Sequence, residues 1–140
     1  MATYPGVRCG LAFDVRRAHR QIPIREDDWG YLACRLDDAP EHEAQDTDIL
    51  YVNTVGTFGV ASAACWWSRL AAIAVRLGYK IAAQVWRLYF LLYVDDGKLM
   101  AMGPNFDVAI LGILLLLQVL GFPLAEHKFR GGTQVAWIGY

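Results

Sequence analysis

Features that would classify the chain at once are missing from its sequence. No Cys-x-x-Cys pair occurs, and the cysteines are only three and lie far apart, at Cys9, Cys34 and Cys65. A disulfide framework and a zinc site are therefore not indicated, and buried thiols in a reducing compartment are the expected role. No long apolar stretch follows a basic start at the N-terminus, so we expect an intracellular protein, in cytoplasm or nucleus, that is not secreted.

Charge is also scarce, because only 19% of the 140 residues are charged and 56% are hydrophobic. That composition excludes a disordered chain and supplies enough apolar material for one packed domain. The net charge of -1 gives no sign of a nucleic-acid partner. However, residues 37–48 hold six acidic residues and no Lys or Arg, so the rest of the chain is basic and compatible with phosphate binding.

Hydrophobic patterning predicts strands alternating with helices. The expected helices are residues 60–77, between Gly59 and Gly78, and 105–120. The expected strands are residues 9–15, 31–36, 49–55, 88–94, 98–102 and 135–140. Strands 88–94 and 98–102 are separated only by Asp95, Asp96 and Gly97, and an Asp-Gly step is a strong hairpin signal. This order predicts an α+β fold, an antiparallel sheet with a central β-hairpin and helices on one face.

Two positions place carboxylates beside extensive apolar surface. Asp95 and Asp96 follow LYFLLYV, and Asp14 ends the strand CGLAF. Neighbouring like charges in such surroundings are costly unless a cation compensates them, although a turn that faces water is the simpler explanation of an Asp-Gly step. Mg²⁺ prefers carboxylate oxygens and shares its other positions with water and phosphate, so two ions held here could serve phosphoryl transfer, with Mn²⁺ as the alternative ion.

Five segments, taken in order, resemble the motifs of reverse transcriptases of the retrotransposon type. YVDD at residues 93–96 is similar to the paired-aspartate signature at the tip of a hairpin. FDVRRAHRQIPI at 13–24 precedes it, as does TFGVASAA at 57–64. LGFPLAEHK at 120–128 and WIGY at 137–140 follow it. The resemblance covers nearly all of the chain and implies the palm of an RNA-directed DNA polymerase, with a partial fingers insertion at about residues 25–55.

The resemblance also implies roles for particular residues. Asp14, Asp95 and Asp96 would be catalytic and, with the carbonyl of Val15, would bind the metals. His19, Phe58, Gly59 and Lys128 would lie near the incoming nucleotide or the template, and Trp137, Ile138 and Gly139 would form the primer grip. The implied partners are an RNA or DNA template with its primer, deoxynucleoside triphosphates and the remaining polymerase subdomains.

Departures from the family pattern affect two expectations. His19 stands where the family has Phe or Tyr, so we expect weaker exclusion of a ribose 2′-hydroxyl. The full fingers, the thumb and the RNase H domain have no counterpart, so we expect this chain to be inactive by itself.

Other functions remain open at this point. A polymerase-derived module could bind nucleic acid without catalysis, and an RNA-dependent RNA polymerase shares the palm plan. Residues 108–125 are uncharged over a length at the lower limit for a membrane-spanning helix, which leaves a small membrane protein as a further alternative. Gly112, Gln118, Gly121 and Pro123 interrupt that segment and argue for a buried helix and no membrane contact.

Overall fold

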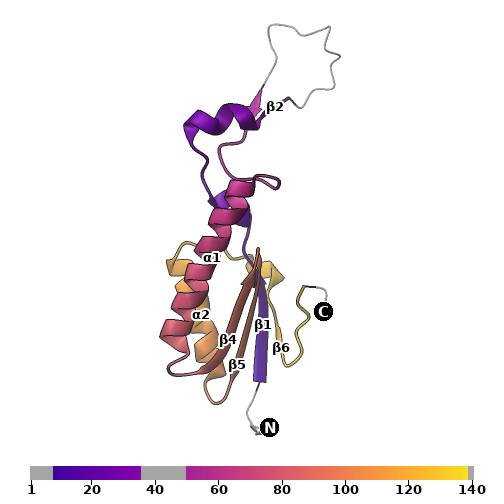
Figure 1. Ribbon diagram of the computed structural model, residues 1–140. Coiled ribbons are helices and arrows are strands. Elements are labelled where there is room, and N and C mark those ends of the chain that lie inside the picture. The colour runs from indigo at the N-terminus through magenta and orange to yellow at the C-terminus, as the bar shows by residue number, and fades with distance from the viewer. Residues whose placement is uncertain (1–7, 36–49, 139–140) are drawn as a thin grey trace, which may run out of the picture. The chain divides into compact units, whose positions relative to one another are not determined.

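The computed structural model describes residues 8–35 and 50–138 (Figure 1). The chain divides into two compact units, one made of Met1–Ala18 with Ser68–Tyr140 and the other of His19–Trp67. The larger unit holds an antiparallel sheet with helices, which is an α+β arrangement.

Four strands form the sheet of the larger unit. They lie in the order β4-β5-β1-β6, and every neighbouring pair is antiparallel. Their bounds are β1 Arg8–Asp14, β4 Arg87–Tyr93, β5 Asp96–Met102 and β6 Arg130–Gly132. The strands β4 and β5 form a hairpin, whose second strand lies beside β1 in the middle of the sheet (Figure 1).

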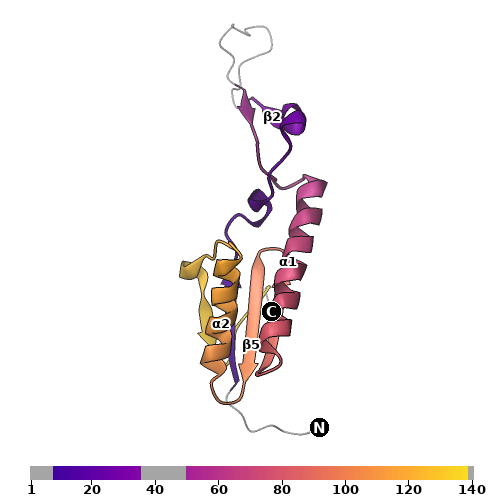
Figure 2. The same ribbon diagram turned by 90° about the vertical axis from the view of Figure 1, so that its left-hand side faces the viewer.

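Helices cover one face of this sheet. The part of α1 (Ala61–Ala82) that belongs to this unit and the whole of α2 (Phe106–Val119) lie on the same side, with β5 visible between them (Figure 2). Side chains of β4 alternate between buried and exposed, as expected for a strand with one covered face. Phe90, Leu99 and Ile113 are almost fully buried there, and each contributes about 1.5–3 kcal/mol by leaving water.

Helix α1 runs past Gly78, which the sequence had indicated as its end. A Cβ atom at this position would lie 2.8 Å from Cδ1 of Phe90 and 3.1 Å from Cδ1 of Ile113. Glycine is present because the helix packs closely on the sheet, so the prediction of a helix boundary there was wrong. One residue later, the hydroxyl oxygen of Tyr79 accepts a hydrogen bond of 3.0 Å from the backbone N–H of Phe90 in β4.

The C-terminal part differs from the prediction of a strand at residues 135–140. Residues 135–138 form no regular structure, and Gly139 and Tyr140 lie outside the described residues. A strand forms earlier, at β6, where Gly131 and Gly132 have little apolar surface and pair with β1 through the backbone. The short helix η4 (Glu126–Lys128) precedes it. In the part of the chain that the structure describes, no helix has the length and apolarity needed to cross a membrane.

The smaller unit contains short elements. They are η1 (Ala18–Gln21, which begins one residue before this unit), η2 (Glu26–Leu32), β2 (Ala33–Cys34) and β3 (Tyr51–Val52). The strands β2 and β3 pair antiparallel, and they are shorter than the expected strands 31–36 and 49–55. The backbone N–H of Gly56 donates to the carbonyl of Ile22 at 2.8 Å. A Cβ atom on Gly56 would lie 2.5 Å from the carbonyl oxygen of His19, so a side chain has no room there.

Candidate active site

The pairing of β1 with β5 places two carboxylates directly opposite each other. Asp14, the last residue of β1, is the register partner of Asp96, the first residue of β5. Cross-strand partners project from the same face of a sheet, with Cβ atoms roughly 4.5–5.5 Å apart. The adjacent pair, Phe13 with Gly97, points to the face that carries the helices. The two carboxylates therefore project from the opposite face of the sheet.

A two-residue turn produces this register. Tyr93 pairs with Asp96, so the turn consists of Val94 and Asp95, whereas the sequence had placed the connection at Asp95, Asp96 and Gly97. Val94 has a φ of 53°, a conformation that is strained for a β-branched residue. Because the turn ends at Asp95 and not at Gly97, Asp96 becomes a strand residue beside Asp14.

Gly97 has a packing role in place of the expected turn role. The Phe13 ring lies over it, and a Cβ atom at position 97 would be 2.0 Å from Cζ of that ring. Phe13 is almost fully buried and contacts the rings of Phe90 and Phe129, each with a centroid distance of 6.4 Å. These contacts fix β1 and β5 against each other one residue away from the carboxylates.

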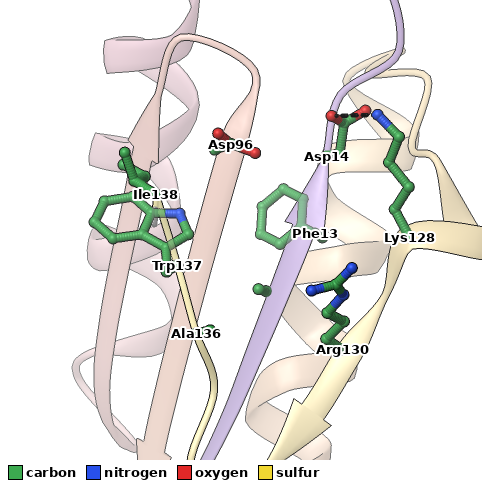
Figure 3. Close-up of a pocket in the computed structure, with 9 residues that line it drawn as sticks. Phe13, Asp14, Asp96, Lys128, Arg130, Ala136, Trp137 and Ile138 are labelled. Carbon is green, nitrogen blue, oxygen red and sulfur yellow. Dashed lines mark hydrogen bonds and ion pairs between the residues drawn. The ribbon is translucent and has the colours of Figure 1, made fainter. Parts of the chain in front are cut away.

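Lys128 brings a positive charge into direct contact with Asp14. Its Nζ donates to Oδ2 of Asp14 at 2.8 Å, and the Asp14 side chain is only 13% exposed (Figure 3). The segment before η4 is held against β1, because the backbone N–H of Ala125 donates to the carbonyl of Asp14 at 2.9 Å. The resemblance implies a place for this lysine near the incoming nucleotide, which stays a prediction, and the structure places its ammonium group beside Asp14.

The proximity of these charges changes their proton affinities. Burial raises the pKa of Asp96, and the negative charges of Asp95 and Asp14 raise it further, while Lys128 partly opposes these effects. The hydrogen bond and the charge of Asp14 raise the pKa of Lys128 above its usual value, so its ammonium group is charged at neutral pH. A carboxylate whose charge is disfavoured by burial and by other acids is one that a cation would stabilise.

The main chain of the turn is fixed by Val15. Its backbone N–H donates to the carbonyl of Asp95 at 2.8 Å, and its side chain is fully buried. The resemblance implies the Val15 carbonyl as a metal ligand, and Val15 forms an isolated antiparallel bridge with Leu124.

The donor set fits magnesium held partly by other molecules. Among residues 8–35 and 50–138, no three His, Cys, Asp or Glu side chains gather closely enough to hold a metal ion by themselves. Mg²⁺ is usually held by one or two carboxylates and takes its other ligands from water and substrate phosphates. The facing pair of Asp14 and Asp96 matches that mode of binding.

A pocket of about 360 Å³ opens beside the carboxylates. Asp14, Asp96 and Lys128 line it together with Arg130, Trp137 and Ile138 (Figure 3). Within the described residues, the buried Nε1 of Trp137 has no hydrogen-bond partner, and Nζ of Lys98 lies 5.6 Å from the centroid of the Trp137 ring. Gly139, the third residue of the predicted primer grip, is outside the described part.

Arg130 is a pocket residue that the sequence analysis did not identify. It pairs with Ala12, two residues before Asp14, and so projects from the same face as the carboxylates. Strand spacing gave no signal for it, because Lys128 ends η4 and the strand begins only at Arg130. It remained hidden because β6 was not predicted.

His19, Phe58 and Gly59 belong to the smaller unit, and their placement near the nucleotide stays a prediction. The His19 and Phe58 rings make an edge-to-face contact, with centroids 5.2 Å apart. Phe58 is 87% exposed, and Gly59 has a φ of 92°. In the described residues His19 Nδ1 is buried without a hydrogen-bond partner.

Comparison with known proteins gives no family assignment. The chain matches no protein-family model, and no curated protein is significantly similar to it.

Proposed function

We propose that the chain is the palm of a reverse transcriptase and performs template-directed nucleotidyl transfer as part of a larger polymerase. The observation that supports this most directly is the cross-strand pair of Asp14 and Asp96 beside a two-residue hairpin turn. Nothing in the packing of the sheet requires two acids at this position, since their mutual repulsion weakens the pairing.

In this proposal Asp14 and Asp96 bind Mg²⁺, with Asp95 as the third acid. The ion would neutralise charge on the primer 3′-hydroxyl and on the triphosphate, and phosphoryl transfer depends mainly on such positioning and charge stabilisation. Lys128 is protonated, so it contributes a positive charge and a proton donor near the leaving pyrophosphate and cannot act as a base. It exchanges its hydrogen bond to Asp14 for one to phosphate when substrate binds.

The nucleic acid would lie along the face of the sheet without helices. Trp137 and Ile138 line the pocket beside the carboxylates, as a primer grip would. Phe58 and Gly59 would contact the template or the incoming nucleotide.

Iron-mediated cleavage tests the metal site directly. Fe²⁺ replaces Mg²⁺ at oxygen-rich sites and, with ascorbate and peroxide, cuts the nearby backbone. We expect cuts close to residues 14 and 96 that excess Mg²⁺ suppresses, and no such cuts in Asp14→Asn/Asp96→Asn. If the folded wild-type chain shows no Mg²⁺-sensitive cleavage at either place, the polymerase proposal is wrong. Circular dichroism establishes that each variant is folded.

One observation favours a second function, a polymerase-derived module that binds nucleic acid without catalysis. The ion pair between Lys128 and Asp14 compensates that largely covered carboxylate without a metal. In such a module, Mg²⁺ would leave the melting temperature unchanged, while a primer–template duplex would still bind in a fluorescence anisotropy titration. The polymerase proposal requires both Mg²⁺ and the duplex to bind.

His19 gives a test of sugar selection that rests on the proposed function. An imidazole is smaller and more polar than the ring expected at this position, so we expect His19→Phe to favour deoxynucleotides more strongly than wild type. Competition of dNTP and rNTP for the ternary complex with duplex measures the ratio of affinities. Equal ratios in both forms would remove His19 from the nucleotide site.

A further inference from the structure

The two units of the chain carry opposite charge. The smaller unit, His19–Trp67, holds three arginines, no lysine and nine acidic residues, so its formal charge is -6 with histidine neutral. The larger unit holds the other ten basic and five acidic residues, so its formal charge is +5. The candidate active site lies in this basic unit. The field of the acidic unit favours cationic partners, so we searched it for a site that could take one.

A pocket of about 370 Å³ lies entirely within the smaller unit. Two aromatic side chains line it, Tyr31 and Trp66, and they are 87% and 56% exposed. The rest of its wall is mainly apolar and consists of Ile22, Pro23, Ile24, Leu32 and Val60. This volume is within the usual range of ligand sites, and exposed aromatic rings beside apolar surface are typical of binding surfaces.

The charged residues of this pocket leave one carboxylate uncompensated. Arg25 is engaged by Asp27, with 2.7 Å between Nη2 and Oδ2. Asp28 also lines the pocket, and among the described residues no hydrogen bond or ion pair engages its side chain. The pocket therefore combines the faces of two aromatic rings with one free negative charge. Both features attract a cation.

We propose that this pocket binds an arginine side chain from a basic segment of a partner protein. The guanidinium group is planar, so it stacks on Tyr31 or Trp66 and donates two hydrogen bonds to the carboxylate of Asp28. The aliphatic stem of the arginine lies along the apolar wall. Lysine fits less well, because its ammonium group is a strongly hydrated point charge. The charge of the unit steers basic segments toward the pocket, independently of nucleotidyl transfer.

NMR titration with the tripeptide acetyl-Leu-Arg-Leu-amide tests this site, and the indole N–H signal of Trp66 is the readout. Trp66→Leu identifies that signal by its loss. We expect the signal to shift saturably up to about 10 mM peptide, because a single docked side chain binds in roughly the millimolar range. The same peptide with citrulline in place of arginine keeps the shape without the charge, and it should bind at least about tenfold more weakly.

Two substitutions in the pocket have matched controls in the same unit. Asp28→Asn and Tyr31→Leu should each weaken binding of the arginine peptide about threefold to fivefold, by removing the carboxylate and one aromatic face. Glu26→Gln and Tyr51→Leu should leave the affinity unchanged, because neither residue lines the pocket. All four side chains are exposed, so the variants retain the fold.

Several results would overturn the proposal. They are a Trp66 signal that does not shift saturably, equal affinity for the arginine and citrulline peptides, or equal losses in the pocket variants and their controls. Displacement of the arginine peptide by oligothymidylate would assign the pocket to nucleic acid. A Trp66 signal that shifts with protein concentration alone would assign it to a second copy. The iron cleavage test at Asp14 and Asp96 probes the larger unit, so either proposal can fail while the other stands.

Discussion

Asp96→Asn is expected to stabilise the metal-free protein and to destabilise it relative to wild type when Mg²⁺ is present. Like charges directly opposite each other in a sheet cost roughly 0.2–1 kcal/mol, and the partial burial of Asp96 adds to this cost. Removing one charge should therefore raise the free energy of unfolding at pH 7 by about 1 kcal/mol. For a chain of this size, that corresponds to a rise of about 3–5 °C in the melting temperature.

The pH dependence has a definite sign. The pKa of Asp96 is raised in the folded protein above its ordinary value of 3.8, so the folded state holds this proton more tightly than the unfolded state. Wild-type stability is therefore lost as pH rises through the window between the ordinary and the raised pKa, and it is regained as pH falls through that window. The advantage of Asp96→Asn should be full at pH 7 and shrink on acidification.

Mg²⁺ should make wild type more stable than Asp96→Asn, which is the reverse of the order without metal. A ligand at 100 times its Kd stabilises the folded state by about 2.7 kcal/mol, which exceeds the expected gain of about 1 kcal/mol from the substitution. Thermal unfolding by circular dichroism, at pH 4 to 8 and with or without MgCl₂ in large excess over its Kd, measures both effects. Asp28→Asn is the control, because that exposed acid belongs to the smaller unit. If Asp96→Asn lowers metal-free stability at pH 7, the electrostatic description of the site is incorrect.

Three further substitutions test the packing and charge around the carboxylates. Val94→Gly should raise stability by about 1 kcal/mol in urea unfolding, because glycine relieves a backbone strain of order 1–3 kcal/mol but is more flexible when unfolded. Gly97→Ala should lower stability by about 1–3 kcal/mol in the same assay, because the Phe13 ring must move. The charged form of Lys128 stabilises the wild type below pH 10.5, and this stability is lost as pH rises through the raised lysine pKa. Lys128→Met should therefore be less stable than wild type at pH 8, and the difference should shrink at higher pH in thermal scans up to pH 11.5.

Two of these substitutions have a matched control variant, and the third has an outcome that would contradict it. Gly131→Ala should be nearly neutral, because its Cβ atom would lie an ordinary 3.7 Å from Leu11. A loss as large as that of Gly97→Ala would mean that glycine matters for strand flexibility and not for ring packing. Lys80→Met, at the exposed end of α1, should show no such alkaline loss of stability. An unchanged or lower stability of Val94→Gly would indicate that the turn is not strained.

The sequence predicted elements better than it predicted registers. Apolar runs located α2 and the two hairpin strands to within two residues, because burial of one face dictates their spacing. The connection was expected at Asp95, Asp96 and Gly97 but lies at Val94 and Asp95, since an Asp-Gly step is a hairpin signal only if nothing else demands the glycine. Here Gly97 is required by the Phe13 ring, a contact between residues distant in sequence. Gly78 was misread as a helix end for the same reason.

The candidate site, too, could be predicted only in part: its residues could be chosen from the sequence, but not the way in which they pair. Asp14 and the Asp95–Asp96 pair could be selected from the sequence because carboxylates beside apolar strands need compensation. Their pairing across β1 and β5 could not be selected, since it depends on the turn. Arg130 was missed because β6 consists of Arg-Gly-Gly, which has no hydrophobic pattern and pairs only through its backbone.

The hydroxyl of Tyr79 gives the two borders of the sheet different properties. A strand that joined an exposed border would need free backbone amides at its middle, and on the β4 side the Phe90 amide is already bonded to this tyrosine. An approaching chain would have to displace a side chain of α1 before it could add to the sheet there. Helix α1 therefore hinders the addition of another strand at the β4 edge of the sheet, and it also covers one face of the sheet.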